Sequence, residues 1–304
     1  MEGTLRNKAA LAIFLGALPQ VLQAQWSQPI VRAELLADTG AIRPGRPFGL
    51  GVLLHIQSGW HIYWLNPGEA GEATSVRYTL PDGFAAGAVQ FPVPERFEDP
   101  GGIVGYGYTD SLLLVSEITA PKDLAPGTRV TLRARARWLS CKDACVPGEA
   151  ELKIELPVAT SAEPANAPLF AEWRDRLPVD ADSPAGPAKV RVSGGIAARG
   201  SRGRFEIVLE WRRVPGKVEW FPGPQPALGI EDVAVRTEGT HTRITFSARV
   251  LSGQTLNDAE LSSVVSYVDS QGQPRGIEVR VPLREGRGQE AKGEGTTISS
   301  QHAR

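Results

Sequence analysis

Residues Arg129–Pro157 read RVTLRARARWLSCKDACVPGEAELKIELP, with the chain's two cysteines at the centre. Before the cysteines, apolar residues alternate with threonine and arginine, and behind them apolar residues alternate with glutamate and lysine. A period of two residues is typical of a strand with one buried face. Two such strands so close in sequence predict an antiparallel β-hairpin.

The register of this hairpin follows from folding the stretch about Asp143. The apolar pairs are then Val130 with Leu156, Leu132 with Ile154, Ala134 with Leu152 and Ala136 with Ala150. The charged pairs are Arg137 with Glu149, Arg135 with Glu151, and the like-charged Arg133 with Lys153. Pairs of opposite charge across a hairpin stabilise it by a few tenths of a kcal/mol each. A slip of one residue would turn every apolar side chain to the wrong face.

The predicted register places Cys141 opposite Cys145, with Lys142, Asp143 and Ala144 in a three-residue turn. Opposed residues have Cβ atoms about 4.5–5.5 Å apart, which is near disulfide range. On one continuous strand, residues four apart would be separated by roughly 13 Å. A single helical turn would also bring the cysteines together, so a bridge alone does not establish the hairpin.

Two interpretations of the pair remain open from spacing alone. A structural disulfide closing so short a loop would stabilise the fold by about 2 kcal/mol in the loop-entropy model. A redox pair would use the same tight ring near the hairpin tip, where another thiolate can attack it. Lys142 would favour a thiolate at Cys141, whereas Asp143 would oppose it.

The first residues predict export. Arg6 and Lys8 precede an apolar run from Ala9 to Leu18, and Ala24 offers a small residue for cleavage. This pattern is typical of a signal peptide, here residues 1–24, although an uncleaved anchor is the alternative. The run is about ten residues, half of what spans a bilayer. We expect a periplasmic mature chain without a membrane span, in which a cysteine pair can be oxidised.

The composition argues against several classes of function. The formal net charge is −1, with 33 basic and 34 acidic residues interspersed, so neither a nucleic-acid partner nor an acidic metal store is expected. No phosphate loop, nucleophile elbow or zinc signature is found, and no cofactor is expected. The chain has 33 glycines and 24 prolines and lacks long helical periodicity, which favours short strands joined by turns.

The strand pattern divides the chain into two parts. Residues 25–160 contain the hairpin and further expected strands at Phe48–Ile56, Trp60–Trp64, Ser75–Leu80 and Leu112–Ile118. Residues 188–284 contain expected strands at Phe205–Trp211, Val218–Phe221, Thr242–Val250, Leu261–Tyr267 and Ile277–Val281. About seven short strands in a hundred residues suggest an immunoglobulin-like sandwich. The predicted fold class is all-β, with two immunoglobulin-like β-sandwich domains in tandem.

The remaining segments connect or follow these domains. Residues 161–187 are expected to form a linker with a short helix over Leu169–Leu177, capped by Asn166. Residues 285–304 are rich in Gly, Glu, Lys and Ser and are expected to be a disordered tail.

Three motifs, taken in order, carry a family resemblance: Gly59–Gly68 (GWHIYWLNPG), Tyr106–Tyr108 (YGY) and Trp138–Pro147 (WLSCKDACVP). They resemble the N-terminal periplasmic region of DsbD-type thiol:disulfide interchange proteins, and most closely the ScsB-like branch associated with copper tolerance. The resemblance covers most of residues 28–158. It extends more weakly into the second domain through Val264–Tyr267 and Gly276–Leu283.

The resemblance implies an immunoglobulin-like domain with its cysteines on adjoining antiparallel strands. Such a domain accepts electrons from a thioredoxin-like domain of a membrane electron-transfer protein. It then reduces periplasmic disulfide-containing proteins, as a component of a protein-disulfide reductase, and the family is linked to cytochrome c biogenesis. By resemblance, Cys145 would form the mixed disulfide and Cys141 would resolve it.

In better-known members a loop shields the cysteines, and its counterpart here runs from Phe97 to Gly107. The candidates for shielding or for tuning the thiol pKa are Tyr63, Glu98, Asp99, Tyr106 and Lys142. The sequence departs from the family in having three residues between the cysteines instead of five, and in having Gly105 near the expected position of an aromatic cap. It also lacks the electron-conducting membrane domain and the C-terminal thioredoxin-like domain. We therefore expect one carrier of a relay.

Two alternatives belong to other functional classes. A Cys-x-x-x-Cys pair with a histidine binds copper in copper-delivery proteins of cytochrome oxidase assembly, so Cys141 and Cys145 could form a copper site. Those proteins are thioredoxin-like, whereas this sequence lacks alternating strands and helices. The other alternative is an interaction module with a structural disulfide. Tyr63 and its tryptophan neighbours are expected mainly to pack, although alternation along a strand allows some of them to border the cysteines.

Overall fold

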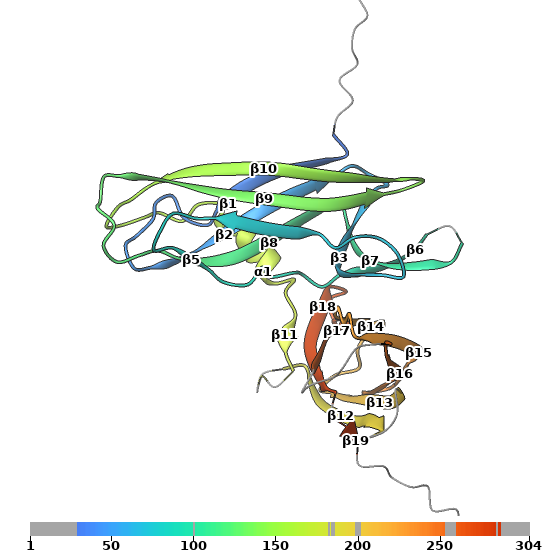
Figure 1. Cartoon of the computed structure of the whole chain (residues 1–304). Coiled ribbons are helices and arrows are strands. Elements are labelled where there is room, and N and C mark those ends of the chain that lie inside the picture. Colours follow the sequence, from blue (N-terminus) through green and yellow to red (C-terminus); the bar gives the residue numbers. More distant parts are fainter. Residues whose placement is uncertain are drawn as a thin grey trace, which may run out of the picture.

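The computed structural model describes residues 29–99, 101–181, 183, 186–197, 202–252, 260–283 and 285–286. The predicted signal peptide and the predicted tail beyond Gly286 lie outside these residues. Figure 1 shows two β-sandwiches, the first ending in a long hairpin and the second lying beneath it. This architecture confirms the predicted all-β fold of two immunoglobulin-like domains in tandem with a short helix.

The first sandwich packs two antiparallel sheets. One has the strand order β1 (Val31–Ala37), β2 (Pro47–Ile56), β8 (Ser111–Thr119) and β5 (Ala85–Ala86). The other has the order β10 (Cys145–Pro157), β9 (Arg129–Cys141), β3 (His61–Gly68), β7 (Ile103–Thr109) and β6 (Glu95–Asp99), with β4 (Ser75–Thr79) also paired to β9. Leu54, Ile62 and Leu132 are among the buried residues between the sheets. The alternation along β9 therefore turns its even-numbered residues into this core.

The single helix of the described residues, α1 (Ala167–Arg174), packs on the first sandwich. Its Phe170 and Trp173 are buried in the first core. Phe170 lies against Gly49 and Gly51 of β2, where a Cβ atom would come within 3.3 and 3.2 Å of its ring. The two glycines thus leave the outer face of β2 open for the helix.

The predicted N-cap residue of this helix is confirmed, but capping by its side chain is not. Asn166 occupies the N-cap position in a left-handed conformation, with φ of 53°, and its side chain caps no helix N–H. Its Nδ2 instead donates a hydrogen bond to the carbonyl oxygen of Ala37, at 2.9 Å. The side chain therefore fastens the start of the helix to strand β1.

The second sandwich also has two sheets. One has the order β11 (Val179–Asp180), β18 (Pro274–Pro282), β17 (Glu260–Val268) and β14 (Val218–Pro222). The other has the order β15 (Leu228–Glu238), β16 (His241–Val250), β13 (Arg202–Trp211), β12 (Ala188–Ala197) and β19 (Glu285–Gly286). Stacked rings of Phe205, Phe246 and Trp220 fill its core. Strands β12 and β15 were not predicted, and β19 lies at the start of the predicted tail.

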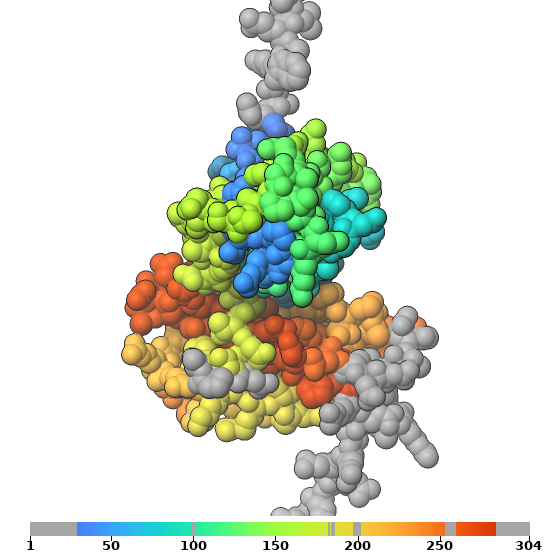
Figure 2. All heavy atoms as spheres, turned by 90° about the vertical axis from the view of Figure 1, so that its left-hand side faces the viewer, coloured from blue at the N-terminus to red at the C-terminus, as the bar shows by residue number. Residues whose placement is uncertain are grey.

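The two sandwiches pack against each other, as the space-filling view shows (Figure 2). Phe221 and Val264 of the second domain are buried in the hydrophobic cluster of the first. Two hydrogen bonds also cross the boundary, from Asn66 to the carbonyl oxygen of Pro222 and from Arg275 to that of Asp175. The second domain therefore closes one end of the first core.

Candidate functional site

The cysteines lie at the tip of the β9–β10 hairpin. Its strands pair continuously from Cys141 opposite Cys145 to Arg129 opposite Pro157, which confirms the predicted register at every position. Arg135 forms ion pairs with Glu149 and Glu151, at 2.8 and 3.2 Å. Hydrogen bonding to Arg135 lowers the pKa of the Glu149 carboxyl below its usual value. These exposed charges and the buried alanines fix which face of the hairpin meets the core.

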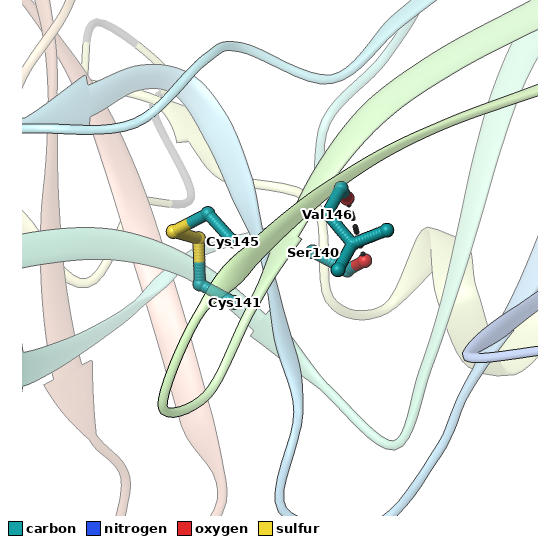
Figure 3. The surroundings of a disulfide bond; sticks show 4 residues. All are labelled: Ser140, Cys141, Cys145 and Val146. Carbon is teal, nitrogen blue, oxygen red and sulfur yellow. Dashed lines mark hydrogen bonds between the residues drawn. A yellow bond between two sulfur atoms is a disulfide. The ribbon is translucent and has the colours of Figure 1, made fainter.

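Cys141 and Cys145 form a disulfide, with Cα atoms 4.1 Å apart. Figure 3 shows both sulfur atoms on one side of the hairpin, whereas Ser140 and Val146 meet on the other side. There the Ser140 hydroxyl donates a hydrogen bond to the carbonyl oxygen of Val146, at 2.9 Å. The strands are thus joined at the tip by backbone pairing and a side-chain hydrogen bond as well as by the disulfide.

The two cysteines differ sharply in exposure. Cys141 has only 2% of its surface exposed, whereas Cys145 is exposed to solvent. The difference follows from the sheet order, because β9 has a neighbour on each side and β10 is the edge strand. An incoming thiol can therefore approach Cys145 more readily than Cys141.

A row of paired residues continues from the cysteines across the sheet. His61 of β3 lies directly opposite Cys141, so the two side chains share one face of the sheet. His61 and Tyr63 are both buried on this face, away from the core between the sheets. Their rings meet edge to face, with centroids 5.2 Å apart. The buried cysteine is thus bordered by an aromatic layer on the outer face.

Phe97 of β6 covers this layer. Its ring centroid lies 3.9 Å from that of His61 and 5.8 Å from that of Tyr63. Phe97 pairs with Gly105 of β7, and a Cβ atom at Gly105 would lie only 2.2 Å from its ring. Gly105 therefore provides the space that Phe97 occupies, and the aromatic ring comes from the neighbouring strand.

The predicted shielding loop is thus a β-hairpin, β6–β7, whose strands pair from Glu95 with Gly107 to Asp99 with Ile103. Glu98 is exposed on the edge strand β6. Asp99 belongs to the same strand, and its side chain lies outside the described residues. The family resemblance predicted a loop over this segment, but most of its residues lie in the paired strands β6 and β7.

The other predicted site residues lie in different surroundings. Lys142 is exposed, and its side chain passes over Gly59, where a Cβ atom would be 3.4 Å from Nζ. Tyr106 lies on the face of β7 opposite to Gly105, and burial raises the pKa of its hydroxyl. The structure therefore brings Tyr63 to the cysteines through His61, and places Tyr106 at the boundary with the second domain.

Sequence reasoning did not place His61 beside the cysteines and did not single out Phe97. The signal for Phe97 was the unusual strand GYG, whose glycines leave room for a ring on one face. Placing His61 beside the cysteines would have required knowing that β3 pairs with β9, which joins residues 80 positions apart. Such long-range pairing is not encoded in local alternation.

The residues that the structure describes contain no helix that is both long and apolar enough to cross a membrane. Within the same residues, His, Cys, Asp and Glu side chains form no group of three or more that could hold a metal ion.

Comparisons with known proteins agree with this geometry. Residues 32–157 match the family described as thiol:disulfide interchange protein DsbD, N-terminal. No curated protein matches the chain. The N-terminal periplasmic domain of ScsB from Proteus mirabilis is similar in structure, with 18% sequence identity and a TM-score of 0.56, over 83% of this chain and 93% of that one.

Two other solved structures match with low TM-scores. One is a protein of unknown function from Porphyromonas gingivalis, with 13% identity and a TM-score of 0.23, over 84% of this chain and 100% of that one. The other is the pilin BcpA from Bacillus cereus in its D312A form, with 9% identity and a TM-score of 0.28, over 84% of this chain and 67% of that one. These two likenesses carry no weight for function.

The family match covers the first sandwich, including both cysteines and the whole β9–β10 hairpin. The ScsB domain shares the fold of both sandwiches, since it covers most of the chain. Residues 32–157 therefore form an N-terminal domain of the DsbD family, a thiol–disulfide exchange module with Cys141 and Cys145 as its cysteine pair.

Proposed function

We propose that this protein is a periplasmic electron carrier that passes reducing equivalents from a thioredoxin-like domain to disulfide-containing proteins. The observation that carries the proposal is the difference in exposure between Cys145 and the buried Cys141. A carrier needs one sulfur that reaches a partner and a second that completes the transfer within the same molecule. The hairpin tip supplies both.

The proposed exchange has two halves, each transferring two electrons. A thiolate of the thioredoxin-like donor attacks the Cys145 sulfur, which breaks the bond to Cys141 and forms a mixed disulfide. The donor's second thiol then attacks the donor's first sulfur in that mixed disulfide and releases the Cys145 thiolate. The donor is left oxidised, and Cys141 and Cys145 are both reduced. In the second half, the Cys145 thiolate attacks a disulfide of the target protein. Cys141 then attacks the Cys145 sulfur and releases the reduced target.

Shielding of the pair is part of the proposal. Phe97 covers His61, which borders Cys141, so one side of the disulfide is closed by rings from β3 and β6. We propose that Phe97 is the shielding residue and that Tyr63 supports it through the shared aromatic layer. Lys142 lies between the two cysteines in the sequence and is exposed, so its charge can help to select partners.

The test is to trap the mixed disulfide. Cys141→Ala should trap a thioredoxin-like domain, or a target protein, on Cys145, because the resolving thiol is missing. Cys145→Ala should trap little, because the remaining thiol is buried. Non-reducing electrophoresis followed by mass spectrometry measures both yields. Equal trapping by the two variants would contradict the assigned roles, and no trapping by either would contradict the carrier function.

A structural disulfide is the competing explanation. The hairpin is already held by pairing along the whole length of its strands and by the bond from Ser140 to Val146. A crosslink between residues that are paired in any case adds little constraint, about 2 kcal/mol for so short a loop. The position of the bond therefore favours exchange over stabilisation.

A further inference from the structure

The second domain contacts the first directly behind the strand that carries Gly105. Phe221 of β14 is buried, and its ring packs edge to face on Tyr106 of β7, with centroids 5.2 Å apart. Tyr106 follows Gly105, and successive residues of a strand point to opposite faces. Phe221 therefore supports one face of β7, while Phe97 lies on the other face.

A second contact holds the segment beside this strand. Asn66 donates a hydrogen bond to the carbonyl oxygen of Pro222, at 2.8 Å, and accepts one from the backbone N–H of Gly68, at 3.0 Å. Gly68 pairs with Gly105, and a Cβ atom at Gly68 would lie 2.3 Å from the carbonyl oxygen of Val104. The segment and β7 are therefore in close contact, and Asn66 links both to the second domain.

Glu69 completes this link. Its backbone N–H donates to the carbonyl oxygen of Val104, and its carboxylate accepts from the backbone N–H of the same residue, both at 2.9 Å. Val104 lies in β7, one residue before the glycine beneath Phe97. A continuous series of contacts thus runs from Pro222 through Asn66 and Glu69 to Val104, near the turn of the β6–β7 hairpin.

We infer that the second domain is a positioning element for the cysteine pair. Through Phe221 and the hydrogen bond of Asn66 to Pro222, it holds the β6–β7 hairpin closed, with Phe97 over the aromatic layer beside Cys141. Loss of either contact increases the fraction of molecules in which the β6–β7 hairpin has moved away from the aromatic layer. The disulfide reacts faster in proportion to that fraction. The inference rests on the proposed function for its purpose, but the contact can be tested without a partner protein.

The test uses the full mature chain and dithiothreitol as the reductant. One thiolate of dithiothreitol attacks the Cys145 sulfur and releases the Cys141 thiolate. The second thiol then closes the oxidised dithiothreitol ring and frees Cys145, so two electrons pass to the protein. Quenched alkylation and mass spectrometry give the rate constant. Asn66→Ala should raise it about two- to tenfold, the range expected for losing one net hydrogen bond. Phe221→Ala should raise it at least as much.

Phe205→Ala is the matched control, because Phe205 is equally buried but lies in the core of the second domain. It should leave the rate unchanged. Asn66→Ala keeps the test valid if loss of Phe221 prevents folding. An increase with Phe205→Ala equal to that with Phe221→Ala would assign the effect to general loosening and overturn the inference, as would unchanged rates in both interface variants.

A double-variant experiment separates positioning from stability. In a Phe97→Ala background the shield is already absent, so Asn66→Ala should add nothing to the rate. An undiminished increase in that background would overturn the inference, and so would a Phe97→Ala variant that reacts like the natural chain. These outcomes are distinct from failure of the proposed function, in which no thioredoxin-like partner exchanges with Cys145 although the rates with dithiothreitol change as expected.

Discussion

The ring of Phe97 packs at a tilt on that of His61, with centroids 3.9 Å apart, and His61 lies directly opposite Cys141 in the sheet. Side chains from β6, β3 and β9, which are distant in sequence, thus lie next to one another beside Cys141. The arrangement leaves the edge cysteine, Cys145, as the exposed member of the pair. We propose that Phe97, on a separate hairpin, limits access to the disulfide from the side of Cys141.

The first prediction tests this control without removing the shielding ring. Gly105→Ala places a methyl group 2.2 Å from the Phe97 ring, so the ring must move away from its present position. We expect the disulfide to be reduced several-fold faster by dithiothreitol, measured by quenched alkylation. Gly87→Ala is the control, because its new Cβ would meet nothing closer than 3.4 Å. Equal rates for Gly105→Ala and the natural chain would show that Phe97 does not limit access.

The second prediction concerns where the first domain ends. Phe170 and Trp173 of α1 are buried in the first core although they lie in the predicted linker. Deleting a buried aromatic side chain costs about 3–5 kcal/mol. A fragment of residues 25–160 should therefore unfold at much lower urea concentration than a fragment of residues 25–178. Coincident unfolding curves by circular dichroism would mean that α1 does not stabilise the domain.

Local pattern predicted much of this fold, and the β9–β10 hairpin shows why. Its alternation, its charge pairs and its two cysteines all specify the same register, and the structure has that register throughout. Each signal acts across a short turn, so no distant contact is needed. The strands Phe48–Ile56 and Thr242–Val250 were predicted for a similar reason, since their ranges nearly match β2 and β16.

The aromatic layer could not be predicted in the same way. It depends on β3 pairing with both β9 and β7, and on β6 folding back over β7. These pairings join segments whose own sequences do not specify their neighbours. Asn166 is the N-cap residue as predicted, but its side chain does not cap the helix for a related reason, because it binds a distant backbone carbonyl, that of Ala37.

The third prediction follows from Tyr78. Burial raises the pKa of its hydroxyl from 10.0 to about 12, and the hydroxyl donates a hydrogen bond to the carbonyl oxygen of Leu50. In the unfolded chain the group ionises near pH 10, so its contribution is fully present below that pH and is lost as pH rises toward 12. A shift of two pKa units corresponds to about 2–3 kcal/mol.

The measurement is the free energy of unfolding in urea at several values between pH 9 and pH 12, for the natural chain and for Tyr78→Phe. Because phenylalanine cannot ionise, the variant should lose less stability over this range, and the gap between the two proteins should shrink as pH rises. Parallel curves would show that Tyr78 ionises at the same pH in the folded and unfolded chains.

The last prediction separates a carrier from a structural crosslink by its reduction potential. Structural disulfides typically have potentials below about −300 mV, whereas thioredoxin-like proteins lie near −270 mV or higher. We expect the Cys141–Cys145 pair to lie in the second range and to be reduced by a thioredoxin-like domain while the protein stays folded. The reduced protein should keep its β-sheet spectrum, because backbone pairing and the bond from Ser140 to Val146 hold the hairpin without the disulfide. Equilibration with glutathione buffers, with thiols counted by alkylation, gives the potential. A bond that resists reduction until the domain unfolds would leave a crosslinked interaction module and end the carrier proposal.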